Sequence, residues 1–173
     1  MPMNRLLPVM SLLCLFAVSP AMGQSGIRGH DSNAPVDVGA DRIEVQDRNN
    51  RAIFSGNVIA RQGNLNFTSA RLTVVYANSS GAGTDIQRLE ASGGVTLRSP
   101  NETARSQFAI YDVDRRIVTM IGGVTLNQGG NHVQGGRLVL DLDTNRAVMD
   151  GGTPSSGGRV TGRFTVPRRS SGN

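Results

Sequence analysis

The sequence predicts an all-β protein built from short antiparallel strands, and three observations carry this prediction. Apolar residues alternate with polar or small ones along most of the chain, which is the period of a strand with one buried face. No stretch keeps apolar residues at the i, i+3, i+4, i+7 spacing of an amphipathic helix for the length that a helix needs. A Gly-x-Val phrase recurs at Gly56, Gly93 and Gly122, and Gly151 marks a partial fourth copy.

The N-terminal segment has the anatomy of a secretory signal peptide. A short cationic start precedes an apolar run over Leu6–Val18, and small residues follow it up to Gly23. The run is shorter than the roughly 20 apolar residues that a membrane-spanning helix needs. We expect residues 1–23 to be cleaved on export and residues 24–34 to form a flexible lead-in. The only cysteine, Cys14, lies in the signal segment, so the exported protein is predicted to have no disulfide.

The charge distribution argues against a nucleic-acid binder. The chain has a formal net charge of +5 and a pI of about 10.9. Residues 31–152, however, carry 12 Arg against 13 acidic residues, and the excess of Arg lies at the two ends of the chain. The central part therefore has no basic patch visible in the sequence, and it has few aromatic residues on which bases could stack.

The strands are predicted, in chain order, as pairs of phrases. The first phrase of each pair is "ADRIEV", "ARLTVV", "SQFAIY" or "GRLVLD", each with apolar residues on alternate positions. A polar segment such as "QDRNNR" or "DLDTNR" follows, and its Asp, Asn and Arg content is typical of a tight turn. The second phrase is the strand that runs through Gly-x-Val. We expect roughly a dozen short strands in total.

The spacing of the glycines indicates a repeat with one insertion. Gly93, Gly122 and Gly151 follow one another at 29 residues, whereas Gly56 and Gly93 are 37 residues apart. The additional residues correspond to "ANSSGAGT" at 77–84, a small, polar segment typical of a loop. A Gly on the inner face removes a side chain where a strand bends, and the following Val restores apolar packing. Stacked hairpins of this kind share one apolar inner face and leave strand edges at both ends.

The candidate catalytic and metal-binding residues do not form a site in the sequence. His30 and His132 are the only histidines, and because neither has a partner at metal-ligand spacing, both are predicted to be surface residues. The segment 141–152 begins like a calcium loop but lacks the Gly and the Glu that such a loop requires, so we expect an Asx-rich turn. The Gly-Gly pairs precede no helix, which argues against phosphate loops. We predict no enzymatic activity, no cofactor and no metal.

The run "ADRIEVQDRNNRAIFSGNVIARQGNLNFTSARLTVVY", with the later "GGVTL" and "GGRLVLDL", resembles the LptA/OstA-like family. This family comprises the periplasmic bridge component of lipopolysaccharide transport in Gram-negative bacteria. The resemblance covers about Pro35 to Gly152. It implies an antiparallel β-jellyroll with an open apolar groove that carries the acyl chains of lipopolysaccharide while the sugars stay outside. It also implies a periplasmic location, head-to-tail homo-oligomers, and partners in the transport machinery of the inner and outer membranes.

The resemblance gives the inner face a role, and strand parity supplies its candidate residues. The lipid-groove candidates are Ile43, Val45, Phe54, Val58, Phe67, Leu72, Val74, Leu89, Val95, Leu97, Phe108, Ile110, Met120, Val124, Leu126 and Leu138. For each of them an ordinary packed core is the alternative, and the sequence does not show whether the groove is open. The subunit-contact candidates lie near the two ends: Val36, Val38, Val160 and Phe164.

The jellyroll domain is predicted over residues 35–152, followed by a flexible Gly/Ser/Arg tail over residues 153–173. Alternation over residues 159–166 predicts an edge strand that pairs with the body or with the next subunit. Two other functions remain open. One is a membrane-attached relative in the same machinery, which an uncleaved N-terminus would favour. The other is an exported structural or polysaccharide-binding β-solenoid, which would need aromatic platforms for sugars in a chain with no Trp and two Tyr.

Overall fold

The protein is described by a computed structural model that covers residues 30–78, 84–152 and 157–166. The predicted signal peptide lies outside the described residues, as do the middle of the predicted loop at 77–84 and the two ends of the predicted tail. In the part that the structure describes, ten strands form one antiparallel sheet. None of the helical turns in this part has the length or the apolar character that crossing a bilayer requires. The all-β prediction is confirmed.

The strands run through the described chain with short connections. A 3-10 turn, η1 (Asp47–Asn49), joins the second strand to the third, and the short strands lie at the two ends of the sequence. In chain order they are β1 (Val36–Gly39), β2 (Arg42–Gln46), β3 (Arg51–Gln62), β4 (Leu65–Asn78), β5 (Thr84–Arg98), β6 (Glu102–Asp112), β7 (Ile117–Gln128), β8 (Asn131–Asp141), β9 (Arg146–Asp150) and β10 (Thr161–Arg163).

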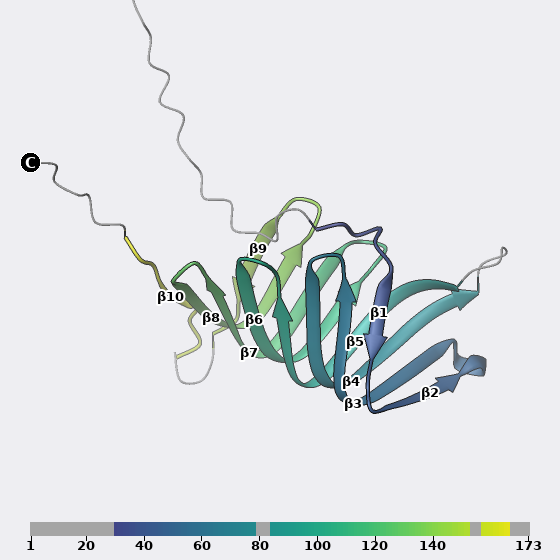
Figure 1. Cartoon of the computed structure of the whole chain (residues 1–173). Helices are drawn as coiled ribbons and strands as arrows, with labels where there is room; N and C mark the ends of the chain where they lie inside the picture. Colours follow the sequence, from purple (N-terminus) through teal and green to yellow (C-terminus); the bar gives the residue numbers. More distant parts are fainter. Residues whose placement is uncertain (1–29, 79–83, 153–156, 167–173) are drawn as a thin grey trace, which may run out of the picture.

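The sheet is a meander with a pair of short strands at each end (Figure 1). Its central order is β3-β4-β5-β6-β7-β8, and each of these strands pairs with its sequence neighbour. At one end, β1 pairs with the second half of β3 and β2 with the first half. At the other end, β10 pairs with the first half of β8 and β9 with the second half. Of the predicted edge strand over 159–166, residues 161–163 form β10 on the body of the protein.

The six central strands are longer than predicted because the repeated glycines bend the strands without ending them. These strands contain 11 to 15 residues each. The pairing register shifts at the middle of each strand pair, for example between Ser55 and Val58 in β3 and between Ser92 and Val95 in β5. Gly56, Gly93 and Gly122 lie in these bulges with φ of 78°, 82° and 92°. A bulge with a left-handed glycine bends and twists its strand, so a line of bulges folds the whole sheet.

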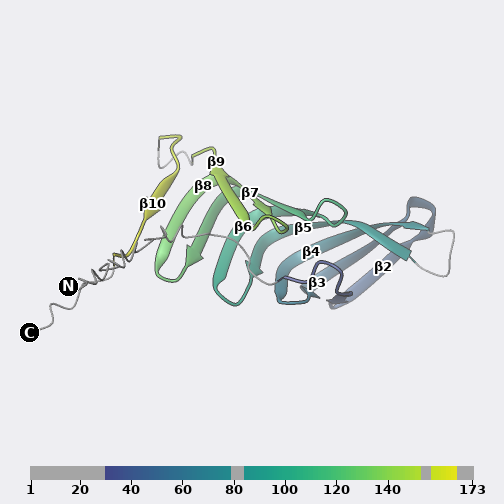
Figure 2. The same ribbon diagram turned by 90° about the horizontal axis from the view of Figure 1, so that it is seen from above.

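The line of bulges divides the sheet into two leaves that face each other. Leaf A contains β1, β10 and the strand halves 58–62, 65–69, 95–98, 102–106, 124–128 and 131–135. Leaf B contains β2, β9 and the halves 51–55, 71–77, 86–92, 108–112, 117–121 and 137–141. The view from above shows the hairpin ends of leaf A on one side and leaf B behind them (Figure 2).

The apolar core lies between the two leaves. Phe67 of leaf A stacks on Tyr111 of leaf B, with ring centroids 6.1 Å apart. The Tyr111 hydroxyl donates a hydrogen bond to Oε1 of Gln62, across the same gap, at 2.9 Å. Burial raises the pKa of the Tyr111 phenol, so it remains a donor at physiological pH. Gln62 also donates to the backbone carbonyls of Ser32 and Ala34, which fastens the segment before β1 to leaf A.

A pair of glycine variants tests the role of the bulges. We expect Gly93→Ala to lower the free energy of unfolding by about 2–3 kcal/mol, because a Cβ would lie 2.7 Å from Cβ of Ala70 and the backbone has a positive φ. Gly94→Ala is the matched control: its φ is 80°, but its Cβ would meet nothing within 4 Å, so only the backbone strain of about 1–2 kcal/mol applies. Urea denaturation measures both variants, and equal losses would contradict the close approach.

Candidate functional site

The candidate site is the apolar interior between the leaves, where inward-facing residues form rows that cross the sheet. One row passes through directly paired residues from β3 to β8. Its members are Phe54, Leu72, Ala91, Ala109, Met120 and Leu138. A second row in leaf A contains Ala60, Phe67, Leu97, Ala104, Leu126 and Val133. Such rows make one continuous apolar stripe along the axis of the sheet.

Most of the predicted groove residues face this interior. Eleven of them are buried, with 0% to 8% of their surface exposed: Val58, Phe67, Leu72, Val74, Leu89, Val95, Leu97, Met120, Val124, Leu126 and Leu138. Phe54 is half-buried and packs against the same cluster. The interior along these residues is therefore packed.

Phe108 and Ile110 do not face the interior, and their assignment to the inner face is wrong. They are 56% and 40% exposed on the outer face of leaf B, while Ala109 and Tyr111 take the inward positions. The reason is the bulge: between two paired positions β5 has two residues, Gly93 and Gly94, and β6 has only one. The alternation along β6 therefore changes face at this point.

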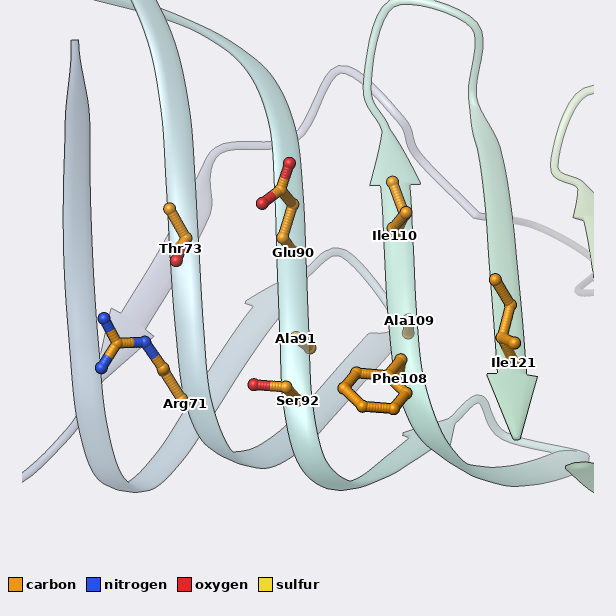
Figure 3. A pocket seen from close by; sticks show the side chains of 9 residues that line it. All are labelled: Arg71, Thr73, Glu90, Ala91, Ser92, Phe108, Ala109, Ile110 and Ile121. Atoms are coloured by element: carbon orange, nitrogen blue, oxygen red, sulfur yellow. The ribbon is translucent and has the colours of Figure 1, made fainter. Parts of the chain in front are cut away.

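The outer face of leaf B has a shallow hollow of its own beside these residues. Figure 3 shows Phe108, Ile110 and Ile121 on one side of it and Arg71 and Glu90 on the other. Its volume is about 450 Å³. The Glu90 carboxylate forms an ion pair with Arg88 at 2.7 Å. This surface is separate from the interior, because the sheet lies between the two.

The inner face is uncovered at the β2 end. Ile43 pairs with Phe54 and Val45 pairs with Ala52, so both side chains lie on the inward rows. They are nevertheless 55% and 57% exposed. Val36 and Val38 of β1 are half-buried at the corresponding edge of leaf A. The apolar stripe thus reaches the end of the molecule and is open to solvent there.

The other end presents β9 and β10. Ala147 and Met149 of β9 are half-buried and pack against the core. A hollow of about 150 Å³ lies there, and Phe164 forms part of its wall. Of the predicted contact residues, Val160 is 41% and Phe164 is 67% exposed. Apolar side chains therefore reach both ends of the sheet.

The remaining candidates for chemistry have structural partners. Nδ1 of His30 lies 3.2 Å from Oδ1 of Asn64, and Nδ1 of His132 lies 2.7 Å from Oδ1 of Asn127. Both histidines are half-buried and therefore less exposed than free surface side chains. Among the described residues, no group of three or more His, Cys, Asp or Glu side chains is arranged to hold a metal ion.

The turn between β8 and β9 is the predicted Asx-rich turn. Oδ1 of Asp141 accepts hydrogen bonds from the backbone N–H groups of Thr144 at 2.9 Å and Asp143 at 3.1 Å. The hydrogen bonds from Thr144 lower the pKa of the Asp141 carboxyl most. The backbone N–H of Asp143 and the positive charge of Arg146 lower it further. Because this pKa is lowered on folding, the turn contributes stability above the ordinary aspartate pKa and loses it as the pH falls through the lowered value. The Asp143 carboxylate is engaged by Arg116 at 2.9 Å.

Sequence reasoning missed the buried polar contact between the leaves. The alternation does not point to Tyr111, because Phe108 and Ile110 alternate equally regularly on the other parity and are more apolar. Gln62, which is 4% exposed, carried no signal, since a polar residue at a strand end reads as solvent-facing. The available clue was the Gly93-Gly94 pair, which forms the bulge in β5.

The fold and the site together define an open antiparallel β-jellyroll whose apolar interior runs from one pair of edge strands to the other. Residues 37–146 match the family model of the "LptA/(LptD N-terminal domain) LPS transport protein". The chain belongs to this family.

Individual relatives agree with this membership. The chain is 31% identical to an uncharacterized protein of Rhizobium meliloti over 134 residues, which is 75% of this chain and 70% of that protein. It is 25% identical to the lipopolysaccharide export system protein LptH of Pseudomonas aeruginosa over 88% of this chain and 89% of LptH. The LPS-assembly protein LptD of Yersinia enterocolitica is 30% identical over 63% of this chain, but that match spans only 14% of LptD.

The fold has a solved counterpart. The crystal structure of LptH from Pseudomonas aeruginosa superposes with a TM-score of 0.67 at 21% identity, over 79% of this chain and 99% of that chain. LptH is described there as the LptA-homologous periplasmic component of the lipopolysaccharide transport device. The predicted jellyroll is confirmed by this likeness.

Proposed function

We propose that this protein is a periplasmic bridge component that binds lipopolysaccharide and passes it from the inner towards the outer membrane. The acyl chains occupy the interior between the leaves, and the sugars stay in solvent. The observation that carries the proposal is the continuous apolar interior that reaches both ends of a sheet in a member of this transport family. The named relatives are transport and assembly proteins, and the role proposed here is binding and transfer.

The ends of the sheet support head-to-tail assembly as part of this function. Each end carries two short strands, one on each leaf, whose outer edges have no strand partner among the described residues. Unpaired strand edges are templates for strand addition by another chain. A copy that adds β2 to the β9 edge of the next, with β1 at the corresponding edge of leaf A, would join the two interiors. The same edges would serve relatives of the same fold at either membrane.

Loading requires the leaves to separate, because the interior residues are packed against one another. Nine large interior side chains besides Tyr111 have at most about 2% of their surface exposed: Leu65, Leu72, Leu97, Met120, Leu138, Val58, Val95, Val118 and Val124. Acyl chains that enter would replace apolar contacts between the leaves by contacts of the same kind, so the exchange preserves the hydrophobic gain. The bulges give the sheet a bend at which the angle between the leaves can change.

The alternative of a structural or polysaccharide-binding β-solenoid is not favoured. The chain matches a transport family over most of its described sheet, and it supplies few aromatic side chains for sugar stacking. The cleaved signal peptide remains a prediction, since residues 1–23 lie outside the described residues. Cleavage in the periplasmic fraction, read by N-terminal sequencing, separates the free carrier from a membrane-attached relative.

A matched pair of phenylalanines tests the proposal. A photoreactive phenylalanine analogue at Phe54 is expected to form adducts with lipopolysaccharide in the periplasm, because this side chain lies on the inward row and is half-buried. The same analogue at Phe108 is expected to give none, because that ring lies on the outer face and is 56% exposed. The readout is a mobility shift that an anti-lipopolysaccharide antibody recognises after irradiation.

The control compares like with like, since the two sites carry the same side chain on the same leaf. Adducts only at Phe108 would move the lipid site to the outer face. Absence of adducts at both sites in a folded, exported protein would contradict lipid transport. The interior would then be an ordinary packed core.

A further inference from the structure

The C-terminal end of the interior is covered by a short segment of the chain itself. Thr161, Gly162 and Arg163 of β10 pair with Gln134, Val133 and His132 of β8. Beyond the strand, the backbone N–H of Thr165 donates to Oδ1 of Asn131 at 3.0 Å, and its hydroxyl donates to the carbonyl of Gly130 at 3.1 Å. The segment is thus anchored on both sides of Phe164.

Phe164 lies over the mouth of the interior. Gly162 pairs with Val133, which belongs to the inward row of leaf A, so Phe164 two residues later shares that face. The ring passes so close to Gly162 that a Cβ there would lie 2.9 Å from the ring. The ring also forms a wall of the hollow of about 150 Å³, whose apolar lining is Leu126, Val133, Leu138, Ala147 and Met149.

The hollow continues the apolar interior and has a size that suits the end of a hydrocarbon chain. Leu138 and Leu126 in its wall are members of the two inward rows. A cavity of about 150 Å³ is large enough to hold a molecule such as benzene. A hydrocarbon chain that lies along the rows would therefore reach this hollow and meet the ring of Phe164.

The covering segment is held weakly enough to be displaced. β10 has three residues, all of them exposed, and pairs with a single strand. Phe164 is 67% exposed, so it buries only a third of its surface in the closed position. Since hydrophobic stabilisation is roughly proportional to the apolar area removed from water, this contact is far weaker than that of the buried core residues.

We propose that the ring of Phe164 occupies a binding site for the end of an acyl chain at the C-terminal mouth of the interior. An incoming hydrocarbon chain displaces this ring together with β10. Displacement opens the end of the interior and at the same time frees the β8 edge at 131–135 for an edge strand of the next copy. Lipid binding at this end and exposure of the β8 edge to the next subunit are then coupled, because both require β10 to leave. This inference rests on the proposed function and specifies a gate at the C-terminal end of the interior.

Two substitutions test the competition directly. The chain contains no Trp, so Phe164→Trp introduces a single tryptophan reporter. Sodium dodecanoate below its micelle concentration is expected to shift its emission to the red and to increase its quenching by iodide. Val166→Trp, at a position that is 82% exposed, is expected to show no change. In the complementary variant Phe164→Ala the competitor is absent, so dodecanoate should bind roughly threefold to tenfold more tightly. Unchanged emission at 164 in the presence of bound dodecanoate would overturn the proposal.

A reversible clamp tests the opening with lipopolysaccharide. Thr161→Cys with Gln134→Cys, in a Cys14→Ser background, joins two directly paired residues of β10 and β8. The oxidised clamp should reduce the transfer of lipopolysaccharide from one copy to the next several-fold, and a reductant should restore it. Thr119→Cys with Val139→Cys, which joins β7 to β8 on leaf B, is the matched control and should transfer normally in both states.

The failure of the gate and the failure of the transport function are distinguishable in this experiment. Normal transfer by the oxidised clamp, with lipopolysaccharide adducts still formed at Phe54, would overturn the gate and leave the transport function intact. Loss of the adducts at Phe54 in every variant would instead contradict the transport function itself.

Discussion

Met120→Ala is expected to lower the free energy of unfolding by about 2–5 kcal/mol, because truncation of a fully buried side chain removes its burial and leaves a cavity. Met120 is 0% exposed and lies between Ala109 and Leu138 on an inward row. A domain of this size is stable by about 5–15 kcal/mol, so the loss is a large part of the total. Urea or thermal denaturation of the purified protein measures it.

The matched control is the neighbouring residue on the other face. Ile121 is 42% exposed, so Ile121→Ala should cost less than about 1 kcal/mol. A loss of similar size in both variants would contradict the packed interior, because Met120 would then be solvated in the folded state as well. Added lipopolysaccharide should raise the midpoint of both variants, since a ligand that binds only the folded state stabilises it by mass action.

The sequence was sufficient for the strands because their two faces differ in polarity. Alternation over "ARLTVVY" and "GRLVLDL" correctly assigned Leu72, Val74 and Leu138 to the interior, where each is buried. The repeated glycines also predicted the bends, since a positive φ at Gly93 or Gly122 is a conformation that favours glycine. Period and turn chemistry are local properties, and local properties can be read from the chain.

The parts that could not be predicted depend on contacts between distant residues. Phe108-Ile110 and Ala109-Tyr111 both alternate, and only the bulge that β5 forms opposite β6 decides which pair points inward. The stacking of Phe67 on Tyr111 joins residues from strands that are not neighbours in the sheet. Whether an apolar stripe is closed or exposed depends on the approach of the second leaf, which no local pattern encodes. This is why Val45 and Val74, on one row, differ so much in burial.

The row that contains Val45 and Val74 ends, at each side of the sheet, on a strand with no further strand partner among the described residues. This position leads to the second prediction of a large effect, a change in self-association. Starting at Val45 of β2, the row passes through Ala52, Val74, Leu89, Tyr111, Val118 and Leu140 to Ala147 of β9. In a head-to-tail stack Ala147 of one copy would meet Val45 of the next, and the row would continue across the junction. Val45→Asp is expected to abolish self-association, with at least about a 100-fold rise in the dissociation constant, because it would bury an unpaired carboxylate.

The stability of the single copy should change little, since Val45 is 57% exposed before assembly. Glu44→Gln, on the same strand but on its outer face, is the control and should assemble normally. Sedimentation velocity over a range of concentrations measures both. Assembly of Val45→Asp with wild-type affinity would show that the β2 end lies outside the junction.

A mixture of two variants distinguishes head-to-tail assembly from a symmetric dimer. Val45→Asp keeps an intact β9 end, and Ala147→Asp keeps an intact β2 end, so neither forms chains alone. A head-to-tail junction joins two different surfaces, so the mixture regains one functional junction per pair and stops at dimers. In a symmetric dimer the same surface is used twice, so the variant that keeps that surface intact dimerises alone and mixing creates no new junction. Dimers that form in the mixture, but with neither variant by itself, would place Val45 and Ala147 at the junction. The interior would then be continuous from one copy to the next.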